Sequence, residues 1–118
     1  MIVEVMSRTR AIEFSFGAHS ERIAVISISD VDKESPELFN NPDNGIFQQF
    51  RVLFDDVEIG QPNCMTDEQA TKIAEFVLGI RDAATKIVVH CEAGVSRSAG
   101  TAAAIMKFLN GERLGCIR

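Results

Sequence analysis

The residues with the clearest chemical potential lie between Lys86 and Gly100, in the run KIVVHCEAGVSRSAG. Cys91 becomes a nucleophile when its thiol ionises. Arg97, six residues later, carries a planar guanidinium that can bind two oxygens at once. Gly94 lies between them and lets the backbone curl tightly. A thiolate, a ring of donors and a bidentate cation are the groups needed to attack phosphorus.

The elements around these residues predict an anion-binding position. The apolar run Ile87–Val89 favours a strand buried on both faces, and the small residues after Ser98 favour a helix. Backbone N–H groups in a loop and at a helix start lack intrahelical partners, so they can bind an oxyanion. The helix dipole adds partial positive charge at the same place. We therefore expect this field to favour the thiolate form of Cys91.

The run HCEAGVSRSAG resembles the signature loop of the cysteine-dependent protein tyrosine phosphatase superfamily, and it is most similar to the dual-specificity branch. The resemblance rests on His before Cys, on Gly at the third place after it and on Ser after Arg. The context between a strand and a helix adds to it. It spans roughly residues 23 to 110 and is sharp only at 86 to 100.

The resemblance implies a role for each residue of this loop. Cys91 attacks phosphorus and forms a covalent thiophosphate, while Arg97 binds the phosphoryl oxygens and stabilises the charge of the transition state. Ser98 donates a hydrogen bond to the sulfur of Cys91, with helix capping as an alternative role, and His90 orients the loop. The residues expected to bind phosphate mainly through backbone N–H groups are Glu92, Ala93, Gly94, Val95 and Ser96.

The leaving oxygen needs a proton, which in the resembled family comes from an Asp on a separate loop upstream of the Cys. The run VLFDD at 52–56 resembles the apolar strand that carries this acid. Asp55 and Asp56 are both candidates, and we favour Asp56 because it aligns best. Asp67 is a weaker third choice, since it suits the first turn of the next helix.

Composition narrows the remaining possibilities. The 118 residues favour a single catalytic domain over 1–118, with 46% hydrophobic and 25% charged residues. The net charge of -5 argues against nucleic acid or a membrane surface as the main partner.

The three cysteines show no metal or disulfide spacing, so we expect no metal and no cofactor. A reactive thiol without a leader or spanning run indicates a cytoplasmic protein. The oligomeric state stays open.

The pattern of the chain predicts an α/β fold. Strands are expected at 2–5, 23–28, 47–54 and 86–90. Helices are expected after a Ser35 cap, after a capping box at Thr66 to about residue 83, and over about 99–109. The chain over 8–17 is ambiguous, although Phe14 and Phe16 are expected to reach the core, and His19 to lie in a solvated loop.

Strands that alternate with helices predict a mostly parallel central sheet of about four to five strands, flanked by helices. The fold is expected to resemble that of the protein tyrosine phosphatases, with the site at the carboxyl ends of the strands. The resembled family usually continues with further helices after the loop, whereas this chain stops at Arg118. We therefore expect either a minimal version of the fold or a fragment.

The expected function is hydrolysis of phosphate monoesters of proteins. Phosphotyrosine is the first substrate, and phosphoserine and phosphothreonine are left open. A second hypothesis keeps the chemistry and changes the substrate to a phosphoinositide, a nucleotide or an RNA 5′ end. Glu92 and the lack of Lys in the loop count against such polyanions. A third hypothesis is a catalytically silent phosphate-binding module, against which Cys91, Arg97, Ser98 and an upstream Asp argue together.

Overall fold

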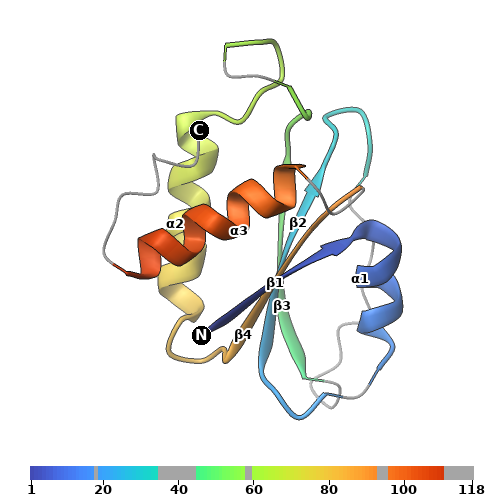
Figure 1. Ribbon diagram of the computed structural model, residues 1–118, viewed down its shortest axis with the longest axis vertical. Helices are drawn as coiled ribbons and strands as arrows, with labels where there is room; N and C mark the ends of the chain where they lie inside the picture. Colours follow the sequence, from blue (N-terminus) through green and yellow to red (C-terminus); the bar gives the residue numbers. More distant parts are fainter. Residues whose placement is uncertain (18, 35–44, 58–59, 93–95, 111–118) are drawn as a thin grey trace.

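A parallel sheet forms the centre of the structure, a computed structural model that describes residues 1–17, 19–34, 45–57, 60–92 and 96–110 (Figure 1). Within these residues the sheet has four strands in the order β1-β4-β2-β3, and every neighbouring pair is parallel. The strands are β1 (Ile2–Ser7), β2 (Ile23–Ser29), β3 (Ile46–Leu53) and β4 (Lys86–Cys91).

The two central strands are the most deeply buried of the four strands described. Every residue of β2 is buried, and in β4 all residues after Lys86 are buried. Because both faces of a parallel sheet are covered by helices, central strands of this kind read as continuous apolar runs. The edge strands β1 and β3 are only partly buried.

Helices cover both faces of the sheet. α1 (Arg8–Ser15) lies on one face, and α2 (Asp67–Ile80) and α3 (Ser96–Leu109) lie on the other (Figure 1). Ser7 caps α1 by accepting a hydrogen bond from the Arg10 N–H, and Thr66 and Gln69 form a capping box at α2. The starts of α1 and α2 are therefore each fixed by a side-chain cap.

The two faces carry separate hydrophobic clusters. The larger cluster packs α2 and α3 against one face and includes Ala24, Ile26, Ile28, Phe54, Ile73, Val77, Ile87, Val89 and Ile105. The smaller cluster packs α1 against the other face and includes Met6, Ala11, Ile23, Val25, Ile46 and Val88. Odd and even residues of β2 thus serve opposite faces, as the strand period of two requires.

The predicted fold class is confirmed, with differences in detail. The ambiguous segment after β1 is the helix α1, and α3 starts at Ser96 rather than near Ala99. The prediction for Phe16 was wrong: α1 ends at Ser15, and Phe16 is 70% exposed. His19 lies in a loop, as predicted, and its half-buried ring stacks on Phe14 with centroids 4.0 Å apart. The predicted helix after Ser35 lies outside the described residues.

Candidate active site

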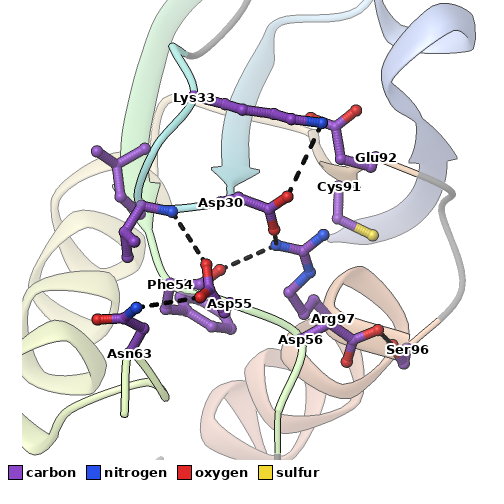
Figure 2. Close-up of polar contacts among 12 residues, drawn as sticks. Asp30, Lys33, Phe54, Asp55, Asp56, Asn63, Cys91, Glu92, Ser96 and Arg97 are labelled. Carbon is purple, nitrogen blue, oxygen red and sulfur yellow. Dashed lines mark hydrogen bonds and ion pairs between the residues drawn. The ribbon is translucent and has the colours of Figure 1, made fainter.

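The carboxyl ends of the parallel strands bring distant residues to one edge of the sheet (Figure 2). Cys91 is the last residue of β4, Asp30 follows β2, and Phe54 follows β3. Because the neighbouring strands point the same way, these three positions meet where α3 begins. The edge therefore holds the predicted nucleophile next to residues that follow two other strands, β2 and β3.

Cys91 is buried, and its thiol contacts Ser98 in the first turn of α3. The sulfur donates a hydrogen bond to Ser98 Oγ over 3.2 Å, and both residues are at least 97% buried. When the sulfur is ionised, the Ser98 hydroxyl has to donate instead. Ser98 is the third residue of α3, so it does not cap the helix. The structure thus places a hydroxyl beside the sulfur, and its donation to a thiolate stays a prediction.

Arg97 is held by one of its terminal nitrogens. Nη1 donates to Asp30 Oδ1 over 2.7 Å and to the Phe54 carbonyl over 2.9 Å (Figure 2). The side chain is 9% exposed, and its buried Nε has no acceptor among the described residues. The two bonds fix the plane of the guanidinium and leave the Nε–H for an oxygen of a bound anion.

Asp55 and Asp56 are adjacent but have different partners. Asp55 Oδ1 accepts from the Val31 N–H over 3.1 Å, and Oδ2 accepts from Asn63 Nδ2 over 3.2 Å. The two carboxylate oxygens of Asp55 thus join the segment after β3 to Val31, which follows β2, and to Asn63. Asp56 instead reaches the start of α3, where its Oδ2 accepts from Ser96 Oγ over 2.5 Å. Asp56 contacts the predicted phosphate-binding loop, whereas Asp55 braces the loops around it.

Glu92 links the loop after β4 to the start of α1. Its backbone carbonyl accepts from the Arg8 N–H over 3.2 Å, and its carboxylate forms an ion pair with Arg8 Nη1 at 3.3 Å. The carboxylate charge is therefore offset by a neighbouring cation. The next three residues of the predicted phosphate-binding loop lie outside the described part of the chain: Ala93, Gly94 and Val95.

His90 belongs to a buried polar chain on the α1 face of the sheet. Its Nε2 lies 2.6 Å from Ser27 Oγ, which also accepts from Gln49 Nε2 over 2.9 Å. Because Ser27 accepts from Gln49, its own proton is available to His90 Nε2. Burial lowers the pKa of His90 to about 4, against a smaller opposing effect of the Cys91 backbone. The ring is therefore neutral at neutral pH, which fits a structural role.

A cavity of about 640 Å³ opens at this edge of the sheet. The apolar residues of its lining include Val31 and Val57, which are 41% and 45% exposed. The charged residues that line it, within the described part of the chain, are Asp30, Asp32, Lys33, Asp55, Asp56, Glu92 and Arg97. Acidic groups thus outnumber basic ones around the predicted phosphate position.

Sequence reasoning missed several residues of this site. Asp30 directly follows a buried strand that neighbours β4, so its place at the carboxyl end of β2 was a usable signal. Ser27 and Gln49 gave no such signal, because the contact of Ser27 with His90 and that of Gln49 with Ser27 depend on strand register. No group of three potential metal ligands gathers within the described residues, and metal independence stays a prediction. None of the helices described is long and apolar enough to span a membrane.

Comparison with known proteins gives one kind of match. Neither protein-family models nor curated proteins match the sequence. The structure is similar to a crystal structure of Tk-PTP, an archaeal protein tyrosine phosphatase, in its active form. The TM-score is 0.56 at 18% sequence identity, and the match covers 98% of this chain and 72% of that chain. The chain therefore has a protein tyrosine phosphatase-like fold.

Proposed function

We propose that this chain is a cysteine-dependent phosphatase, which hydrolyses phosphate monoesters through a covalent cysteinyl-phosphate intermediate. The observation that carries the proposal is the arrangement around Arg97. Asp30 and Phe54 hold Nη1, Nε is buried without an acceptor among the described residues, and Cys91 ends the adjacent strand. A guanidinium fixed in this way is suited to binding phosphoryl oxygens.

The proposed reaction has two steps. In the first, the Cys91 thiolate attacks phosphorus, the S–P bond forms, and the bond to the leaving oxygen breaks. Asp56 gives its proton to that oxygen, and Arg97 with the loop N–H groups stabilises the charge on the phosphoryl oxygens. In the second, water attacks phosphorus, Asp56 takes its proton, and the S–P bond breaks. Inorganic phosphate leaves and the thiolate is regenerated.

The contact between Cys91 and Ser98 supports both steps. A hydroxyl 3.2 Å from the sulfur can donate to a thiolate, which favours the ionised nucleophile in the first step. The same bond stabilises the sulfur as a leaving group in the second step. His90 does not take part in proton transfer in this scheme, because its ring is buried and its Nε2 lies 2.6 Å from Ser27 Oγ on the α1 face of the sheet.

The charges around the cavity favour protein phosphates over polyanions. Asp32, Asp55 and Asp56 line the cavity without forming an ion pair among the described residues. A second phosphate group on a phosphoinositide or nucleotide would approach these carboxylates at an energetic cost. The substrate we propose is therefore a phosphorylated protein side chain, phosphotyrosine first, with phosphoserine and phosphothreonine as further substrates.

The experiment is a comparison of two equivalent substitutions. Turnover of 4-nitrophenyl phosphate is measured for the wild type, Cys91→Ser and Cys64→Ser, where Cys64 is a half-buried thiol. We expect Cys91→Ser to fold and to lose turnover, and Cys64→Ser to retain it. Near-normal turnover in Cys91→Ser would exclude Cys91 as the nucleophile. A wild type that binds phosphate without any turnover would favour the phosphate-binding module instead.

A further inference from the structure

The loop after β3 contacts α3 at two neighbouring places. The Phe54 carbonyl accepts from Arg97, and two residues further on Asp56 Oδ2 accepts from Ser96 Oγ over 2.5 Å. Ser96 is the first residue of α3 (Figure 2). The first two residues of the helix thus hold the segment that carries the proposed acid.

We propose that the Ser96 hydroxyl is a positioning group for Asp56, which places the carboxyl for proton transfer by its other oxygen, Oδ1. This inference rests on the proposed function and deepens it. The resemblance assigns Ser96 only a backbone N–H toward phosphate, so a role of its side chain is additional. Its contact with the acid is a property of this chain's own residues.

The hydrogen-bond inventory of the carboxyl group supports this assignment. Oδ2 is occupied by Ser96, while Oδ1 of Asp56 has no partner among the described residues, and Asp56 lines the cavity that also holds Arg97. In the protonated acid the carbonyl oxygen accepts and the hydroxyl oxygen donates. With the carbonyl oxygen at Ser96, the proton lies on Oδ1 and can move to the leaving oxygen. The same Oδ1 then takes a proton from water in the second step.

Asp55 strengthens the contrast between the two carboxylates. Both of its oxygens accept hydrogen bonds from Val31 and Asn63, so neither is oriented by the helix. The bracing by Asp55 and the contact with Ser96 lie on either side of one peptide bond. Asp55 therefore fixes the position of the loop, and the contact with Ser96 orients the side chain of Asp56.

The experiment measures kcat/KM for a series of substituted phenyl phosphates whose leaving groups differ in acidity. Phenols that are poor leaving groups need the proton of Asp56, and acidic phenols depart without it. We expect Ser96→Ala to lower kcat/KM for phenyl phosphate by about tenfold. The dependence of log kcat/KM on leaving-group acidity should become steeper, with a value between those of the wild type and Asp56→Asn. Ser96→Thr, which keeps the hydroxyl, should have the kcat/KM and the leaving-group dependence of the wild type.

A double-mutant cycle separates positioning from a merely structural effect. In the Asp56→Asn background, Ser96→Ala should change kcat/KM for phenyl phosphate by less than about twofold. An equal loss in both backgrounds, or an equal loss for all leaving groups, would overturn the inference while the phosphatase function stands. Absence of Cys91-dependent turnover in the wild type would overturn the proposed function and the inference with it.

Discussion

Asp30 Oδ1 accepts a hydrogen bond from Arg97 Nη1 over 2.7 Å, which joins the end of β2 to the first turn of α3. The Arg97 side chain is 9% exposed, whereas that of Asp30 is 29% exposed. The carboxylate therefore balances a largely buried cation and sets the plane of its guanidinium. In the proposed reaction we expect Asp30 to act through Arg97.

We predict that Asp30→Asn lowers kcat/KM by about tenfold, because a bond between charged partners is replaced by a weaker neutral acceptor. Asp32→Asn is the matched control. It removes the same charge from the same cavity wall, and no bond between Asp32 and Arg97 is present. Steady-state kinetics of both variants check the prediction. Equal effects would show that the charge of the cavity matters and the bond to Arg97 does not.

The rate should show a bell-shaped dependence on pH, because the thiolate of Cys91 has to be ionised and Asp56 has to be protonated. Asp56→Asn should lower kcat by on the order of a hundredfold or more and remove the alkaline limb. The pH dependence of kcat/KM for phenyl phosphate in the wild type and this variant checks the prediction. An unchanged alkaline limb in Asp56→Asn would place the acid elsewhere.

Asp55→Asn should lower the stability of the protein and leave the pH dependence of the rate unchanged, in contrast to Asp56→Asn. An amide offers one acceptor oxygen, so its nitrogen would face a donor, either the Val31 N–H or Asn63 Nδ2. Because both hydrogen bonds are exposed to solvent, we expect a loss of about 0.5–1.5 kcal/mol in the free energy of unfolding, with the alkaline limb preserved. Urea denaturation together with the pH profile tests this expectation. Loss of the alkaline limb in Asp55→Asn alone would reverse the roles of the two carboxylates.

His90 should make the stability of the protein depend on pH. Burial lowers its pKa from 6.5 to about 4, so between these values the unfolded state binds more protons than the folded state. The contribution of His90 to stability is therefore fully present above pH 6.5 and is lost as the pH falls toward 4. The shift corresponds to about 3 kcal/mol.

The variant that tests this is His90→Gln, whose side-chain oxygen can accept from Ser27 but does not titrate. Urea denaturation of both proteins between pH 7 and about 4.5 gives the comparison. We expect the wild type to lose more stability over this range than His90→Gln. If the two proteins lose stability in parallel, protonation of His90 does not drive the acid sensitivity.

The local pattern of the sequence predicted most of the fold. The apolar runs of β2 and β4 and the capping box at Thr66 are signals carried by neighbouring residues, so their elements were predicted within a few residues. Phe16 was wrongly predicted to be buried, because the sequence did not indicate that α1 ends one residue earlier, at Ser15. The start of α3 was predicted three residues too late. Ser96 and Arg97 are typical of a loop in the sequence, and their contacts with Asp56 and Asp30 form only in the folded protein.

The residues of the candidate site that could be predicted belong to recognisable sequence motifs, the loop after β4 and the VLFDD segment that carries Asp55 and Asp56. Cys91, Arg97 and Ser98 belong to one motif, and their predicted proximity agrees with the contact between Cys91 and Ser98. Asp30 and Ser27 could not be predicted in this way. They reach the residues of β4 and α3 because β2 lies beside β4 in the folded sheet. A single sequence does not state which strands are neighbours.

The measurement that tests the central claim most directly is the capture of phosphate on Cys91. The enzyme is mixed with excess 4-nitrophenyl phosphate, quenched in acid within milliseconds, digested, and analysed by mass spectrometry of the peptide that contains Cys91. Asp56→Asn is included because slower attack by water should raise the trapped fraction. We predict one added phosphoryl group on Cys91 and none on Cys64. Turnover without any phosphorylated Cys91 peptide, in either protein, would contradict the covalent mechanism.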